Sequence, residues 1–417
     1  MLDERAALCG PFFLNLLNLT RIKLTDSTEP AMPFQALAKY LAVPLLFAYG
    51  LAHAAEAGSP HDRAVYQAVQ VARAMMSSQD IYDRILAAGA LSDIGDSKAL
   101  ETIARALIVD DNVVQRSAID TLITANHPNS VDLLFKSASA SPAILGMMAE
   151  SLASVPRSDM GELLAKALEH ENDFVKRHAL QALVRAPGSG ESAAIEKLEE
   201  NTQTSPIIKA YAEYALLAEG QKSRAKDMMA AAKSTNADIR EVSAVALGLI
   251  DTKESRAALG TLSKDSDQRV ALAAVASDAG LGNQDASGKI IQVIAYGTPM
   301  ESTVLAGAMK RLPGKTALQI TQTLMSCCKL KGDAATRLLE SWAFINADAT
   351  AVYRWGLSHP EADVRMQTIW MVGHRKDAAA ISLLVPFLGD EDPGIRGMAA
   401  WAIIHTKGDS YVEGVET

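Results

Sequence analysis

The sequence predicts an all-α protein made of stacked helix pairs, and three observations support this fold class. Apolar residues make up 49% of the 417 residues, whereas aromatic residues make up only 5%. Apolar positions recur at i, i+3, i+4, i+7 and i+8 over about three turns, which is the spacing of one helix face. This pattern repeats about every 31 residues, a period typical of solenoid proteins.

Each copy of the repeat holds an apolar helix, a break at Gly, Asp, Asn or Pro, and a second apolar helix. A shift of about 31 residues places Arg365 over Arg396 near the C-terminus. Copies start near Asp80, Asp111, Ser141, Asn172, Pro206, Asp238, Asp267, Glu301, Ala335, Asp363 and Gly394. The breaks suit helix ends, since Asp392 can cap a helix whose first turn accepts Pro393. One helix pair cannot bury its own apolar stripe, so the sequence predicts an α-α superhelix of about ten stacked pairs.

Two stretches, Asp238–Leu262 and Asp363–Thr406, carry a family pattern: Val or Ile followed by Arg, small residues along the helix, then Gly and Asp. This pattern resembles HEAT-like repeats of the short bacterial type and extends over about residues 64–409. The resemblance implies a solenoid that serves as a scaffold in most members and as an enzyme in few. It also implies that the repeated Arg and Asp side chains are structural braces, here Arg240, Arg365, Arg396, Asp251 and Asp377.

The segment of residues 32–54 has the composition of a secretory signal peptide. It contains Lys39, an apolar run from Leu41 to Leu51, and small residues before a cleavage site near Ala54 or Ala57. The run has about eleven residues, fewer than the ~20 that a spanning helix needs, so we expect no stable transmembrane anchor.

These features predict three parts of the chain. Residues 1–31 would be a non-native upstream extension, residues 32–54 the signal peptide, and residues 55–417 the HEAT-like solenoid. The mature protein is then expected in the periplasm or outside the cell.

Charge and cysteine content exclude some functions. The formal net charge is -9, and phosphate binding needs a concentrated cationic face, so we expect no nucleic-acid partner. Cys327 and Cys328 are adjacent in sequence. A disulfide between neighbours is strained, so we interpret them as two buried small apolar residues of one helix and leave their oxidation state open.

Motifs for catalysis are missing from the sequence. It has no G-x-S-x-G elbow, no HExxH helix and no glycine-rich phosphate loop. Iron hydroxylases with HEAT-like repeats carry several His-Glu pairs, whereas this chain has only His170-Glu171, and HEAT-like DNA glycosylases would need a basic concave face. We therefore expect a protein that is not an enzyme and that uses no cofactor and no metal.

Three tryptophans share one position in the repeat, which we call the slot: Trp342, Trp370 and Trp401 each stand five residues after an Arg. Earlier copies fill the slot with Gly89, Asp120, Glu150, Gln181, Tyr214 and Val245. On a helical wheel Trp401 falls about 60° outside the apolar arc, so the slot flanks the core. His374 and His405 follow their tryptophans by four residues.

Two interpretations of the slot remain open. The rings either seal neighbouring repeats, or they form an aromatic ladder on the inner surface together with His374, His405 and Tyr214. A metal site at the two histidines is disfavoured because no third ligand is evident. The first functional hypothesis is an exported module that binds an envelope protein through its concave face. The alternative is a periplasmic carrier of a lipid or sterol-like molecule in envelope lipid transport.

Overall fold

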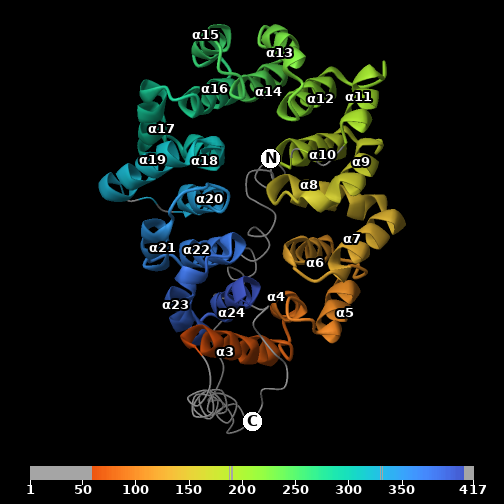
Figure 1. The fold of residues 1–417 in the computed structure, drawn as a ribbon, viewed down its shortest axis with the longest axis vertical. Coiled ribbons are helices and arrows are strands. Elements are labelled where there is room, and N and C mark those ends of the chain that lie inside the picture. The colour runs from red at the N-terminus through yellow and green to blue at the C-terminus, as the bar shows by residue number, and fades with distance from the viewer. Residues whose placement is uncertain (1–58, 187, 189–190, 329, 331, 408–417) are drawn as a thin grey trace, which may run out of the picture. The chain divides into compact units, whose positions relative to one another are not determined.

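The computed structural model describes residues 59–186, 188, 191–328, 330 and 332–407. These residues form α-helices and short 3-10 helices, with no strand among them (Figure 1). The prediction of an all-α fold is confirmed. Within the same residues, no helix has both the length and the apolar character that a membrane span requires. The predicted extension and signal peptide lie outside the described residues.

The chain divides into two compact units. Unit 1 comprises residues 131–368, and the described residues of unit 2 are 59–130 and 369–407. The divisions fall within two helices, α7 (Asn129–Ala140) and α22 (Ala362–Arg375). Unit 1 is therefore an insertion between the two chain segments of unit 2.

Unit 1 is a row of helix pairs. Its helices are α8 (Pro142–Ser154), α9 (Gly161–Leu168), α10 (Asp173–Arg185), α11 (Ser192–Glu200), α12 (Pro206–Ala218), α13 (Ala225–Ala231), α14 (Ala237–Leu247), α15 (Lys253–Leu262), α16 (Gln268–Gly280), α17 (Gln284–Tyr296), α18 (Pro299–Ala308), α19 (Gly314–Cys327), α20 (Gly332–Trp342) and α21 (Thr350–Leu357), with 3-10 helices η1 (Ser158–Met160), η2 (Lys222–Arg224) and η3 (Met309–Arg311). The even-numbered helices α8 to α20 form an inner row in which each helix packs on the next. The odd-numbered helices lie outside them (Figure 1).

Caps and apolar burial explain these helices. Asn236 caps α14 by accepting a hydrogen bond from the backbone nitrogen of Asp238, and Thr252 forms a capping box with Ser255 at the start of α15. Such caps satisfy backbone donors that a helix leaves unpaired. Between these helices lies an apolar core that includes Leu217, Met228, Leu247, Leu259 and Val270. Burying each of these side chains contributes about 1.5–3 kcal/mol.

The predicted arginine braces are confirmed. In each case one Nη1 donates to two backbone carbonyls five and six residues earlier: Arg240 to Ser234 (2.9 Å) and Thr235 (3.1 Å), Arg365 to His359 (3.0 Å) and Pro360 (2.8 Å), Arg396 to Asp390 (2.7 Å) and Glu391 (3.0 Å). Arg84 does the same with Ser78 and Gln79. The arginines thus tie each inner helix to the turn before it. Asp251 accepts from Arg256 and Asp377 caps η4 (Ala378–Ala380), so both aspartates are structural as well.

Unit 2 joins helices from the two ends of the described chain. It contains α3 (Pro60–Met75), α4 (Ile81–Ser92), α5 (Ser97–Ala106), α6 (Asn112–Thr124), η4, α23 (Ile381–Leu384), η5 (Val385–Gly389) and α24 (Pro393–Lys407), with parts of α7 and α22. Helix α24 packs against both α3 and α4. A Cβ atom on Gly397 would lie 2.5 Å from Met75 Cε and 2.9 Å from Leu86 Cδ2, so this contact is close.

The last described repeat is completed by α3, the first helix among the described residues. Among the described residues, α24 has no outer helix after it in sequence, and α3 packs on it as the outer helices pack on their inner partners elsewhere. The predicted number of about ten pairs is confirmed by the sequential pairs from α4–α5 to α22–α23. Helices α24 and α3 form one more pair from opposite ends of the chain.

A polar network with a buried centre joins α24 to the ends of α4, α6 and α22. His405 Nδ1 lies 2.5 Å from Asp93 Oδ2, and both side chains are almost fully buried. The backbone nitrogen of Asn126 donates to Asp93 Oδ1 at 2.6 Å. The side chain of Asn126 has two further contacts: its Nδ2 lies 3.2 Å from His405 Nδ1, and its Oδ1 accepts a hydrogen bond from Lys376 Nζ at 2.7 Å. Buried polar groups that satisfy one another in this way fix one arrangement of the helices they join.

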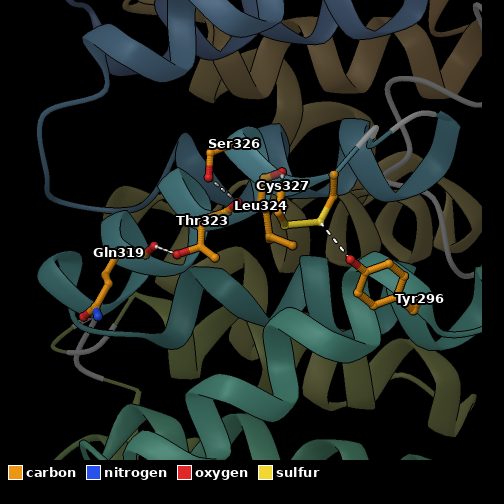
Figure 2. Close-up of a disulfide and its surroundings, with 7 residues drawn as sticks. Tyr296, Gln319, Thr323, Leu324, Ser326 and Cys327 are labelled. Atoms are coloured by element: carbon orange, nitrogen blue, oxygen red, sulfur yellow. Dashed lines mark hydrogen bonds between the residues drawn. A yellow bond between two sulfur atoms is a disulfide. The ribbon is translucent and has the colours of Figure 1, made fainter.

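The cysteine prediction is wrong. The structure joins Cys327 and Cys328 in a disulfide at the end of α19, and Cys327 is exposed rather than buried (Figure 2). The helix ends at Cys327 and Cys328 adopts extended backbone, so the two residues do not sit on one continuous helix as we expected. Tyr296 Oη lies 4.0 Å from Cys328 Sγ (Figure 2).

Candidate functional site on the inner row of unit 1

The structure buries the three tryptophans instead of displaying them. Trp342 is 0% exposed, and its Nε1 donates to Thr321 Oγ1 at 2.9 Å. Trp370 and Trp401 are each 4% exposed. Trp401 fits against Gly373 of the preceding inner helix, where a Cβ atom would lie 2.6 Å from Trp401 Cζ3. The burial supports the interpretation that the rings seal repeats and contradicts a ladder on the surface.

The two histidines belong to the same packing. His374 stacks on Trp370 with ring centroids 5.0 Å apart, and His405 stacks on Trp401 at the same distance. His405 is also held by Asp93. In the part of the chain that the structure describes, no group of three His, Cys, Asp or Glu side chains could hold a metal ion. That Trp370, His374, Trp401 and His405 take part in binding stays a prediction. Such a role would require the tryptophan rings to leave the core.

The slot is more open in unit 1. Gln181, Tyr214 and Val245 occupy it on α10, α12 and α14, and all three are half-buried on the inner row. Gln181 Nε2 donates to Tyr211 Oη at 3.3 Å and so links α10 to α12. Of the predicted site residues in unit 1, Tyr214 is half-buried on the inner row and Trp342 is fully buried. In unit 2, Trp370, Trp401 and His405 are buried and His374 is half-buried.

The positive charges of Arg185 and Arg311 act on Tyr214, and Lys310 lies near both of these arginines. We call Arg185, Lys310 and Arg311 the basic cluster. Arg185 ends α10, and its Nη1 donates to the carbonyls of Ala153 and Ser154 at 2.6 Å each. Its guanidinium lies 4.5 Å from the centroid of the Phe344 ring, a cation–π contact between chain segments that are far apart in sequence.

Lys310 and Arg311 form the end of η3, directly after α18. Ser341 Oγ donates to the carbonyl of Ala306 at 2.8 Å and thereby fixes α20 on α18 beside η3. Neither Lys310 nor Arg311 has a hydrogen-bond or ion-pair partner among the described residues. The two cations are therefore held in place by their backbone and not by a counter-ion.

The charges around the basic cluster do not balance. Glu340 on α20 is bound by Arg337, and Glu241 on α14 lies 3.4 Å from Arg269. Burial and then the positive charge of Arg185 lower the pKa of Lys310 to about 7. Burial lowers the pKa of Arg185 to about 10, while Glu340 acts in the opposite direction and Arg311, more weakly, in the same direction. An excess of positive charge thus faces one part of the inner row, in a chain whose formal net charge is -9.

Such an arrangement can hold an anion. Arginine presents a planar fork that matches carboxylate oxygens, and lysine presents a point charge. Burial of Tyr214 raises the pKa of its hydroxyl, so this group stays neutral and can donate to the same anion.

Sequence reasoning missed Arg185, Lys310 and Arg311, although a signal was present. The chain reads LVRAPG at 183–188 and MKRLPG at 309–314, so that an Arg stands two residues before a Pro-Gly in both stretches. Proline and glycine mark the end of a helix, where a basic side chain can reach beyond the last turn. The repetition of this short motif could have indicated a shared role.

Comparisons with known proteins agree with the repeat architecture. Residues 350–413 match the family model described as HEAT repeats. No curated protein is similar enough in sequence to count as a relative.

Among solved structures, human deoxyhypusine hydroxylase in complex with glycerol is 11% identical; the match covers 76% of this chain and 98% of that chain, with a TM-score of 0.29. Kap95p from a complex with RanGDP is 13% identical, with 82% of this chain and 56% of that chain covered and a TM-score of 0.30. An engineered protein solved by a structural genomics consortium is 14% identical over 82% of this chain and 99% of that chain, with a TM-score of 0.25. Likenesses at these values say nothing about what the chain binds.

The likeness to HEAT repeats rests on the matched segment and on the helix pairs. The matched residues 350–413 include α22 and α24, which carry the braces of Arg365 and Arg396. The same brace recurs at Arg84 and Arg240, outside the matched segment. Residues 350–413 are thus similar to HEAT repeats, and the described helix pairs before them share the same repeat architecture.

Proposed function

We propose that the chain is an exported, non-enzymatic binding module that engages a protein partner through the inner row of unit 1. The observation that supports this proposal most is the basic cluster beside the half-buried Tyr214, because Lys310 and Arg311 have no hydrogen-bond or ion-pair partner among the described residues. Solenoids of this kind offer extended inner surfaces on which a partner can lie. With the tryptophans in the core, nothing in the described residues supports the alternative of a lipid carrier.

Site-specific photocrosslinking in cells tests the use of the inner row. Tyr214 and Tyr296 are each replaced by p-benzoylphenylalanine, in separate full-length proteins. Tyr296 is the matched control because it is a tyrosine of the outer helix α17 and is 76% exposed. Irradiation is expected to trap a partner at position 214 and not at 296. Trapping only at 296, or at neither position, would overturn the proposal.

The proposed export rests on the sequence of residues 32–54 and has its own test. Protein recovered from the cell envelope or the medium is expected to begin just after Ala54 or Ala57 when its N-terminus is determined by mass spectrometry. Recovery of the uncleaved chain from the cytoplasm alone would contradict this part of the proposal.

A further inference from the structure

The basic cluster is a single feature of unit 1 and does not recur with the repeat. The repeated arginines Arg84, Arg240, Arg365 and Arg396 are all engaged as braces by backbone carbonyls. Lys310 and Arg311 have no such engagement among the described residues. A cation that the fold does not use is a candidate for binding an anion from outside the protein.

The cluster is assembled from repeats that are distant in sequence. Arg185 comes from α10 and contacts Phe344, which follows α20, while Lys310 and Arg311 follow α18. We propose that this cluster recognises a carboxylate-rich segment of a protein partner, whose Asp or Glu side chains bind Arg185, Lys310 and Arg311. This inference rests on the proposed function and names the chemistry of the partner.

The surroundings favour an acidic protein segment over other anions. Tyr214 and Phe344 place aromatic rings beside the cations, and these rings suit the apolar side chains that accompany carboxylates in a polypeptide. A nucleic acid brings a dense row of phosphates, which a chain of formal net charge -9 repels beyond the cluster.

The electrostatic state of the cluster supports the same conclusion. Burial and then the nearby Arg185 lower the pKa of Lys310 to about 7, although the carboxylate of Glu340 acts in the opposite direction. A bound carboxylate would add to the effect of Glu340 and favour the protonated lysine. Binding is therefore expected to take up a proton near neutral pH.

Binding of a fluorescein-labelled decaglutamate peptide tests the proposal with the full-length protein. Fluorescence anisotropy is measured at low salt for the wild type, for Lys310→Gln/Arg311→Gln, and for Lys253→Gln/Lys289→Gln. The last variant is a matched control that removes the same charge from two exposed lysines of the outer helices α15 and α17. We expect the cluster variant to weaken binding at least about tenfold and the control to weaken it less than about twofold.

Several results would overturn the inference. These are absence of peptide binding to the wild type, an equal loss in the two variants, or equally tight and cluster-dependent binding of a single-stranded DNA of the same length. Circular dichroism and urea unfolding check that the variant is folded, and a second variant, Lys310→Met, keeps the test decisive if the double variant unfolds.

The crosslinking experiment separates this inference from the proposed function. If position 214 traps a partner equally well with and without Lys310→Gln/Arg311→Gln, the proposed binding function is supported and the inference of an acidic segment fails. If no partner is trapped but decaglutamate binds through the cluster, the proposed function fails and the anion site stands.

Discussion

The two units use the same slot of the repeat in opposite ways. In unit 2 the slot holds Gly89, Asp120, Trp370 and Trp401, and all four are buried. In unit 1, Glu150, Gln181, Tyr214 and Val245 fill the slot and are half-buried, whereas Trp342 is fully enclosed. Both units contain an arginine brace five residues before the slot, at Arg240 in unit 1 and at Arg396 in unit 2, so the helices themselves are built alike.

The difference shows that the neighbouring helix determines whether a residue at the slot is buried or accessible. Trp401 is enclosed because Gly373 leaves room for its ring, and Gly89 is needed because a Cβ there would lie 2.5 Å from Thr121 Cγ2. Tyr214 meets the cations of other repeats and remains accessible. In unit 2 the residues at the slot therefore serve packing, whereas in unit 1 the half-buried residues at the slot remain available to a partner.

Trp401→Ala is expected to have the largest effect. Loss of this buried ring should reduce the free energy of unfolding by about 3–5 kcal/mol, because the space beside Gly373 cannot refill. Tyr214→Ala, at the same slot in unit 1, should cost less than about 1 kcal/mol. Urea unfolding followed by circular dichroism measures both, and equal losses would show that the two units do not differ in this way.

Gly373→Ala should have a smaller but clear effect. The added methyl group would lie 2.9 Å from the Cα atom of Ala402, which is backbone and cannot move aside, so we expect a loss of about 1–3 kcal/mol. Gly260→Ala in α15 is the matched control because a Cβ there meets nothing within 4 Å. That control should stabilise the protein by up to about 1 kcal/mol through its helix propensity. Destabilisation of both variants to the same extent would argue against close packing at Gly373.

Lys310→Met should stabilise the protein while it weakens anion binding. The pKa of Lys310 is about 7 in the folded protein and near 10.5 when unfolded, so the unfolded chain binds more protons between these values. Wild-type stability should therefore rise from about pH 7 to pH 10.5, and the variant should lack this rise. Well below pH 7, where the lysine is charged in both states, the variant should be more stable by about 1–2 kcal/mol.

The pH dependence of stability reflects the charged and titratable groups that face Lys310. These are Arg185 of α10, Tyr214 of α12, Glu241 of α14, Arg311 of η3, and Arg337 and Glu340 of α20. Thermal unfolding of both proteins from pH 6 to pH 10 checks the prediction. A variant that is less stable than the wild type at pH 6 would contradict the cluster as a site of unbalanced charge.

Cys327→Ser/Cys328→Ser should have the smallest effect. A disulfide between adjacent residues closes almost no loop, so it hardly restricts the unfolded chain, and the change in stability should stay below about 0.5 kcal/mol. The comparison of urea midpoints for the wild type with and without reductant measures the same quantity. A larger loss would mean that the turn after α19 supports the inner row.

Local features of the fold could be predicted from sequence, whereas contacts between distant repeats could not. The helix pairs and the braces of Arg240, Arg365 and Arg396 follow from periodicity and from the family pattern, since each involves residues within one repeat. The burial of Trp401 depends on a glycine one repeat away. The basic cluster forms because residues at the ends of α10 and α18 come together on the inner row of unit 1. The repeat period in the sequence does not indicate which distant repeats approach one another.

The pairing of α24 with α3 has a consequence for how the protein can come apart. An ordinary solenoid frays from its terminal repeats, because each end helix has a neighbour on one side only. Here Asp62 in α3 has its pKa lowered by Ser59 and, more weakly, by Lys407 in α24, so the two chain ends of unit 2 are neighbours. A circular permutant that links residue 407 to residue 59 and opens the chain between α13 and α14 should keep unit 2 folded. Conversely, deletion of α3 should loosen the C-terminal helix α24 as well, which hydrogen exchange of residues 393–407 would report.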